Sequence, residues 1–132
     1  MDRAQTVTTL NGFIAIASDQ PEALARFYGA VLATEAKQGL STTHWQVDSP
    51  HIGRIEFYVP SRSRPQKRQA GRLSIGLMQH ASGAKAITVL EIWCQRVVDL
   101  GGTLIEAPRC EDFGAEACLL DPEGNRLLLL VS

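Results

Sequence analysis

The segment Asp121-Pro122-Glu123-Gly124-Asn125 leads almost directly into the apolar run Leu127-Leu128-Leu129-Leu130-Val131. Proline presets φ at the second position of a turn, and Gly-Asn accommodates the positive φ that closes one. A polar turn followed by apolar residues predicts a C-terminal β-strand over residues 126–131. A lone strand cannot bury its apolar side chains, so the elements upstream decide the fold.

The first half of the chain contains a strand, a helix and further strands. Apolar residues alternate over residues 10–17, which predicts a strand. Asp19 stands where an N-cap belongs, and apolar residues then recur at helical spacing as far as Leu32. Strand patterns follow at Thr43–Val47 and Arg54–Val59.

The second half repeats this order after a basic, polar segment, Ser61–Arg68, that reads as a solvated linker. The patterns predict a strand at Arg72–Met78, a helix at about Ala84–Leu100 that ends at Gly101-Gly102, strands at Thr103–Ala107 and Ala115–Leu120, and the last strand.

Length and composition limit the function classes. A chain of 132 residues predicts one domain, and a net charge of −1 argues against nucleic acid as a partner. No apolar run reaches transmembrane length, which argues against a membrane protein. Three cysteines without metal-type spacing predict reduced thiols and a cytoplasmic location.

Three motifs follow one another along the chain: the strand that leads to Asp19, the helix carrying Phe27-Tyr28, and the Asp121–Asn125 turn. In this order they resemble the vicinal-oxygen-chelate superfamily, which includes glyoxalases, extradiol dioxygenases and bleomycin-resistance proteins. The resemblance implies an α+β fold in which two tandem βαβββ modules form a curled mixed sheet around a pocket. The modules would span about residues 8–61 and 71–131, joined by a linker at 62–70, within a single domain 1–132.

Metal-dependent members of this superfamily place four ligands around the pocket. The corresponding positions in this chain are Gly12, Glu56, Arg72 and Leu128. Only Glu56 is a metal-ligand type, because glycine and leucine offer no donor and arginine stays protonated. The resemblance therefore implies a member without the metal site, and we expect no other cofactor.

A pocket without a metal still holds polar groups. Strand alternation places Arg54, Glu56 and Tyr58 on one face, and the resemblance turns that face toward the pocket. Glu56 and Arg72 would anchor a ligand or form a structural ion pair, while Tyr58 and Trp45 would supply aromatic contacts. Glu56 is also the candidate general base.

The same alternation predicts which other residues line the pocket. They are Gly12, Ile14 and Ile16 in the first half, with Ser74, Gly76, Leu128 and Leu130 in the second. His44 and His80 occupy none of the ligand positions, and we interpret them as surface or hydrogen-bonded histidines.

Three functions remain open. We favour a metal-independent small-molecule-binding protein of the glyoxalase/bleomycin-resistance type, for sequestration, transport or sensing, and the resemblance implies a homodimer. The alternative is an enzyme, a lyase, isomerase or dioxygenase with a displaced metal or with Glu56 as base. The third is a protein-interaction module with a vestigial pocket.

Overall fold

The computed structural model describes residues 10–68, 71–81 and 83–132, so residues 8–9 of the predicted first module and 69–70 of the predicted linker lie outside the described residues. Helices and strands follow the order βαβββ twice, which confirms the tandem modules. The first module contains β1 (Phe13–Ala17), α1 (Pro21–Val31), β2 (Ala36–Gln38), β3 (His44–Ser49) and β4 (Gly53–Tyr58). The second contains β5 (Ser74–Gln79), α2 (Ala86–Asp99), β6 (Thr103–Glu111), β7 (Gly114–Leu120) and β8 (Arg126–Val131).

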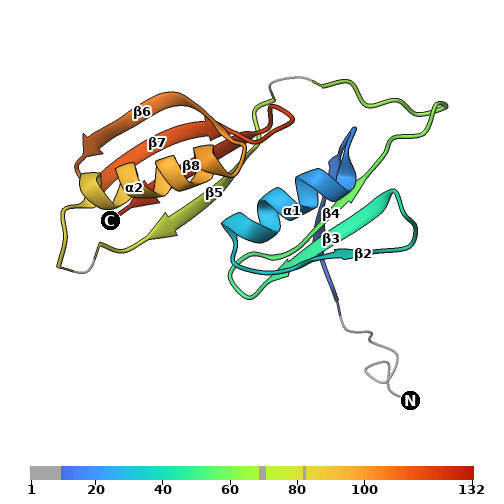
Figure 1. Cartoon of the computed structure of the whole chain (residues 1–132), viewed down its shortest axis with the longest axis horizontal. Coiled ribbons are helices and arrows are strands. Elements are labelled where there is room, and N and C mark those ends of the chain that lie inside the picture. Colours follow the sequence, from blue (N-terminus) through green and yellow to red (C-terminus); the bar gives the residue numbers. More distant parts are fainter. Residues whose placement is uncertain (1–9, 69–70, 82) are drawn as a thin grey trace, which may run out of the picture.

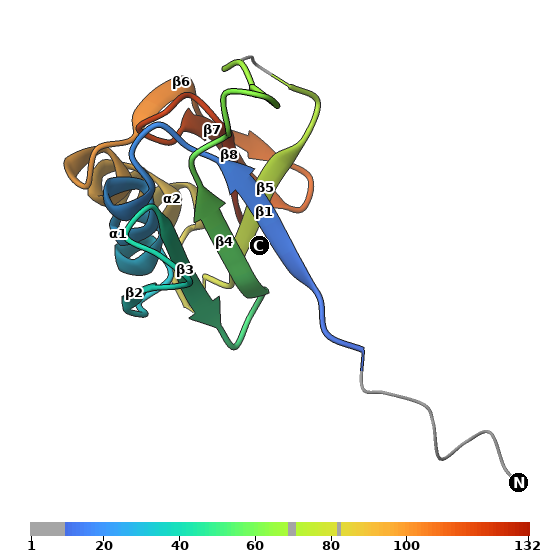
Figure 2. The same ribbon diagram turned by 90° about the vertical axis from the view of Figure 1, so that its right-hand side faces the viewer.

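Each module builds its own four-stranded mixed sheet (Figure 1). The strand order is β1-β4-β3-β2 in the first sheet and β5-β8-β7-β6 in the second. In both, the first strand pairs parallel with the last, and the other pairs are antiparallel. β1 and β5 are therefore edge strands of two separate sheets, and both helices lie on the same side of these sheets (Figure 2).

The core forms where the sheets face the helices. Ile55 and Phe57 of β4 are buried, and Tyr28 of α1 stacks on Phe57 with 5.7 Å between ring centroids. Leu127 and Leu129 of β8 are buried in the same way, and residues of both modules belong to one contiguous apolar cluster. Because successive strand residues point to opposite faces, the alternate side chains of β4 and β8 face away from the helices.

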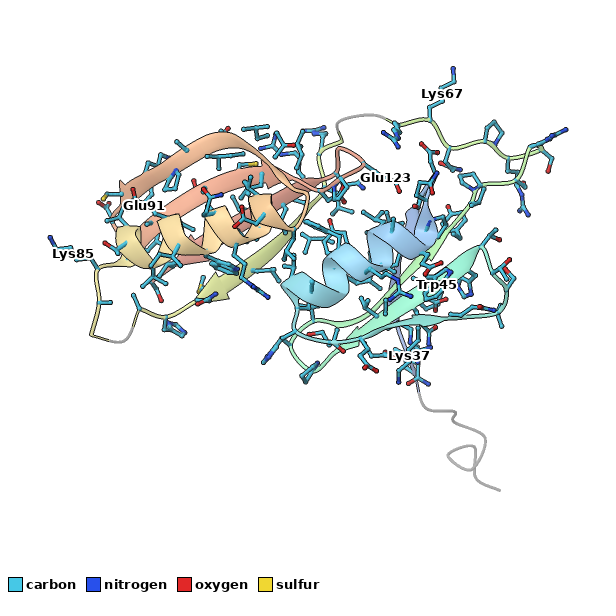
Figure 3. All side chains as sticks on the ribbon, viewed as in Figure 1. Lys37, Trp45, Lys67, Lys85, Glu91 and Glu123 are labelled. Atoms are coloured by element: carbon cyan, nitrogen blue, oxygen red, sulfur yellow. The ribbon has the colours of Figure 1, made fainter. Side chains whose placement is uncertain are left out.

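The Asp121–Asn125 turn joins the second module to the first. The Glu123 carboxylate accepts hydrogen bonds from Ser18 Oγ at 2.5 Å and from the backbone N–H groups of Asp19 at 2.8 Å and Gln20 at 3.2 Å. These donors stand at the start of α1, where a carboxylate is favoured by the free N–H groups and the helix dipole. Figure 3 shows Glu123 where the β7–β8 turn meets the first module. The predicted N-cap was wrong: Gln20 occupies that position, without a side-chain cap, and Glu123 supplies the acceptor from the other module.

A second contact of the same turn is buried. The Tyr28 hydroxyl donates to Asp121 Oδ2 at 2.6 Å, and the amide nitrogen of Asn125 donates to the same oxygen at 2.8 Å. Burial, followed by the charge of Asp121 and this hydrogen bond, raises the pKa of Tyr28 above its usual value, so the phenol stays neutral. The three motifs that carried the family resemblance therefore meet at one place in the molecule.

The register of β1 differs from the prediction. Ala15 lies opposite Glu56, whereas Ile14 and Ile16 lie opposite the buried Ile55 and Phe57. Ile14 and Ile16, which alternation predicted to line the pocket together with Glu56, therefore lie on the opposite face of the sheet from Glu56. The sequence pattern could not reveal which set of β1 side chains shares the face of Glu56. Both Phe13 and Ile14 are apolar, so either alternating set could be taken as the one facing the pocket, and in the structure both are partly exposed.

Some elements differ in length from their sequence patterns. The short β2 has no apolar alternation, and the sequence did not predict it. β6 continues to Glu111, past the predicted end at Ala107, through two irregularities in its pairing with β7. No helix among the described residues has the length and apolar character that crossing a membrane requires.

Candidate functional site

A groove runs between the edge strands β1 and β5, where the two modules face each other. We call it the inter-module groove, and its volume is about 390 Å³. Its lining consists of Ile14, Ala15, Ile16, Ile52, Gly71, Leu73, Ser74, Ile75, Gly76, Asn125 and Arg126. No strand pairing links β1 to β5, so side chains rather than a backbone ladder form this boundary.

Aliphatic side chains form most of the groove wall. Ile14 and Leu73 are exposed into it, and Ile52 reaches it from the β3–β4 turn. A Cβ built on Gly76 would meet no atom within 4 Å, so the missing side chain leaves open space in the wall. The groove thus offers an apolar surface to a small molecule.

Among the described residues of this lining, Arg126 has the only charged side chain. It begins β8, lies opposite Ser74 of β5, and is half-buried. Among the described residues, no salt bridge or hydrogen bond engages its guanidinium. Burial raises the pKa of the Cys118 thiol on β7, and the positive charge of Arg126 acts in the opposite direction by lowering that pKa.

The groove continues toward the linker in a second section of about 380 Å³, which shares Ala15, Ile16, Gly71, Leu73 and Asn125 with the first. Most charged side chains that line this second section form ion pairs with one another. Arg68 donates from Nε to Asp19 at 2.7 Å and lies 3.7 Å from Glu123. Glu123 is also held by the donors at the start of α1, so neither carboxylate is available to Arg126.

Glu56 forms a pair that the sequence did not predict. Its Oε1 lies 2.5 Å from Nε2 of His44 on β3, and both side chains are mostly buried, with 14% and 18% exposed. The other ring nitrogen, Nδ1, accepts the backbone N–H of Leu40 at 2.8 Å. Because an accepting nitrogen carries no proton, the neutral ring has its proton on Nε2 and donates it to Glu56.

The β2–β3 loop is shaped around this histidine. A Cβ on Gly39 would lie only 2.3 Å from His44 Nδ1, so that position has room only for glycine. The Gly39 N–H also donates to the His44 carbonyl at 2.6 Å. Loop and strand together hold the imidazole against Glu56, which matches the interpretation of His44 as hydrogen-bonded.

The structure brings together three of the five predicted site residues. Arg54, Glu56 and Tyr58 share the face of β4 turned away from α1, as alternation predicted. Asp48 engages Arg54 Nε at 3.0 Å, and its hydrogen bond and charge raise the pKa of Arg54. Tyr58 lines a separate hollow of about 430 Å³ against the linker.

The other two predicted residues lie elsewhere. Trp45 is opposite Phe57 in the sheet and therefore on the helix side, where the Arg26 guanidinium lies over the ring at 5.4 Å from its centroid. It does not share the face of Glu56. Arg72 is exposed, has no described ion pair with Glu56, and is absent from the groove lining, although its neighbours Gly71 and Leu73 belong to it.

The donor groups do not fit the metal centre of the metal-dependent relatives. On the face of Glu56, the facing position in β1 is Ala15, and the corresponding pair in the second module is Gly76 with Leu128. His44 is the nearest donor, and it is already hydrogen-bonded to Glu56. Among the residues with described positions, no group of three or more His, Cys, Asp or Glu side chains could hold a metal ion.

Sequence reasoning overlooked Arg126 and the partner of Glu56. Arg126 follows the turn directly and alternates with Leu128 and Leu130, which were predicted to face the pocket, so the same pattern contains it. The His44–Glu56 pair joins adjacent strands whose register no local pattern predicts.

Comparison with solved structures supports the fold. A hypothetical protein from S. aureus is 12% identical with a TM-score of 0.73, and the match covers 99% of this chain and 100% of that one. A glyoxalase/bleomycin resistance protein/dioxygenase family enzyme from Burkholderia phytofirmans is 16% identical with a TM-score of 0.69, covering 90% and 95%. A fosfomycin resistance protein from Mesorhizobium loti is 14% identical with a TM-score of 0.63, covering 96% and 94%.

At these identities the solved structures show the fold alone. No curated protein matches the sequence significantly. The family model described as a glyoxalase-like domain matches residues 13–130, nearly the whole chain. The two βαβββ modules and this match together show that the chain belongs to the glyoxalase-like domain family of the vicinal-oxygen-chelate superfamily.

Proposed function

We propose that the chain is a metal-independent small-molecule-binding protein that holds an organic ligand in the inter-module groove, for sequestration, transport or sensing in the cytoplasm. One observation carries the proposal: an apolar groove of about 390 Å³ contains a single half-buried cation without a described protein partner. Few polar groups in an otherwise apolar concavity are typical of ligand sites.

The groove can be tested by filling it. Gly76 has no positive φ and its Cβ position is open, so Gly76→Val should fold normally while occupying the groove. Native mass spectrometry of freshly purified protein should detect an organic adduct that Gly76→Val lacks. The matched control is Gly12→Val, because Gly12 is equally uncrowded and lies outside the lining. An adduct that survives Gly76→Val, or whose loss is matched in Gly12→Val, would contradict the proposal.

We also propose a homodimer. The apolar side chains Phe13, Leu73 and Met78, on and beside the edge strands, are 59%, 80% and 58% exposed, which is costly for a monomer. A second copy that covers them would also enclose the groove. Light scattering should give twice the chain mass, and Met78→Glu should shift the protein toward monomer by placing charge in the contact.

An enzyme is the second candidate, favoured by the His44–Glu56 pair. A carboxylate bound to an imidazole is an arrangement used in proton transfer. A lyase, isomerase or dioxygenase of this kind would lose turnover in Glu56→Gln, whereas a binding protein would keep its ligand. The third candidate, a protein-interaction module, predicts that no small molecule raises the melting temperature, because only a ligand of the folded state does so.

A further inference from the structure

We infer that the ligand of the inter-module groove is an amphipathic organic monoanion, a carboxylate that Arg126 binds while its apolar body lies against the aliphatic wall. This inference rests on the proposed binding function and adds the chemical class of the ligand. It follows from the position of Arg126, the charges around it and the character of the lining.

The position of Arg126 is set by regular structure. It pairs with Leu120 of β7 on one side and with Ser74 of β5 on the other, so its backbone is held between two neighbouring strands. The preceding turn is held by Asp121, which accepts the Asn125 backbone N–H at 3.0 Å. A guanidinium mounted on such a strand is positioned in advance of ligand binding, which reduces the ordering cost of association.

Among the described residues, no carboxylate forms an ion pair with Arg126. Four other arginines have carboxylate partners: Arg26 with Glu22, Arg54 with Asp48, Arg68 with Asp19, and Arg109 with Glu106, Glu111 and Glu116. The arginines without a described partner, such as Arg64 and Arg72, are exposed to solvent, whereas Arg126 is half-buried. Removing a cation from water is costly unless an anion compensates it, so the groove selects for a negative ligand group.

The residues that line the groove also indicate how many negative charges the ligand carries and what kind of body it has. One cation faces the groove section of about 390 Å³, so a dianionic phosphate would leave its second negative charge without a partner there. A planar guanidinium fits a carboxylate through two parallel N–H···O bonds. Ile14, Ile16, Ile52 and Leu73 supply contact for an alkyl or aryl body. An aliphatic or aromatic monocarboxylate satisfies both requirements.

The test compares ligands that differ only in charge. Octanoate, octanamide and octylamine share an apolar body, and their affinities for the full-length protein can be measured by isothermal titration calorimetry. We expect octanoate to bind at least about tenfold more tightly than the other two, because hydrogen bonds to charged groups are the stronger ones. Arg126→Met should abolish this preference, and Arg126→Lys should keep part of it.

Control variants separate the possible failures. Arg96→Met removes an exposed arginine of α2 outside the lining and should leave octanoate binding unchanged. Equal binding of all three probes, lost in Gly76→Val, would overturn the carboxylate inference and retain a ligand-binding groove. Octanoate binding that Gly76→Val does not weaken, or absence of binding by any probe at about millimolar concentration, would overturn the inference. Circular dichroism melting of Arg126→Met and Arg126→Lys verifies that both variants are folded.

Discussion

At the scale of single residues, hydrogen bonds and burial determine the tautomer of His44 and keep the thiol of Cys94 neutral. His44 is held by the Leu40 N–H on one side and by Glu56 on the other. Cys94 of α2 is 4% exposed, and burial, followed by the charge of Glu91, raises the pKa of its thiol to about 11. Each of these states follows from burial or a hydrogen bond, and each can be measured.

The tautomer of His44 is the first prediction. We expect nitrogen-15 NMR to show an unprotonated Nδ1 and a protonated Nε2 near neutral pH, because Nδ1 accepts the Leu40 N–H. Gly39→Ala should displace the ring and lower the free energy of unfolding by about 1–3 kcal/mol, as overpacking commonly does. Gly12→Ala, at an uncrowded glycine, is the control. A protonated Nδ1 would contradict the assignment.

The pH dependence of stability tests Cys94. Its pKa is about 11 in the folded protein and 9.0 without burial, so the neutral thiol stabilises the fold below pH 9 and this contribution is lost as pH rises toward 11. Between pH 8 and 11 the wild type should lose up to about 2 kcal/mol that Cys94→Ala does not lose. Urea unfolding of both proteins measures the difference. Cys110→Ala, at an exposed thiol, should follow the wild type.

At the scale of elements, the β7–β8 turn completes the start of a helix in the other module. α1 has no side-chain cap of its own, and Glu123 receives one hydroxyl and two backbone N–H groups from the residues before it. The sequence predicts only a turn before the last strand, whereas in the structure this turn also binds the start of α1 in the other module. The hydrogen bonds that join the modules come from the residues before α1 and from Tyr28 within it, and the groove occupies the space between the edge strands.

Removal of the Glu123 carboxylate should weaken this connection. We expect Glu123→Ala to lower the free energy of unfolding by about 1–3 kcal/mol, because three donors lose their acceptor. Glu22→Ala is the matched control: Glu22 is 53% exposed and pairs only with Arg26 within α1, so its loss should cost less than about 0.5 kcal/mol. Equal effects in chemical denaturation would show that the Glu123 contacts add nothing.

At the scale of the whole molecule, two open sheets stand side by side with both helices on one side (Figure 2). A contiguous apolar cluster and the Asp121–Tyr28 contact connect the modules, while their edge strands remain unpaired with each other. This arrangement leaves an apolar groove between the two modules. The groove is thus a consequence of incomplete sheet closure.

The modules should unfold together. Because the apolar cluster spans both, calorimetry of the wild type should give one transition with equal calorimetric and van't Hoff enthalpies. The double variant Glu123→Ala, Tyr28→Phe removes the polar contacts between the modules and should broaden or split the transition. A split transition in the wild type would show that the modules are independent domains.

Local patterns determined the two helices and most of the strands, and the resemblance of three motifs to a known family implied the tandem modules. Helical spacing, strand alternation and turn residues act over a few neighbours, so a sequence contains them directly. The same patterns placed Arg54, Glu56 and Tyr58 on one face of β4. Only tertiary structure decided that Ala15 faces Glu56, that His44 pairs with Glu56, and that Trp45 lies beside α1. These outcomes depend on strand register and on how the modules meet, which are set by packing between segments distant in sequence.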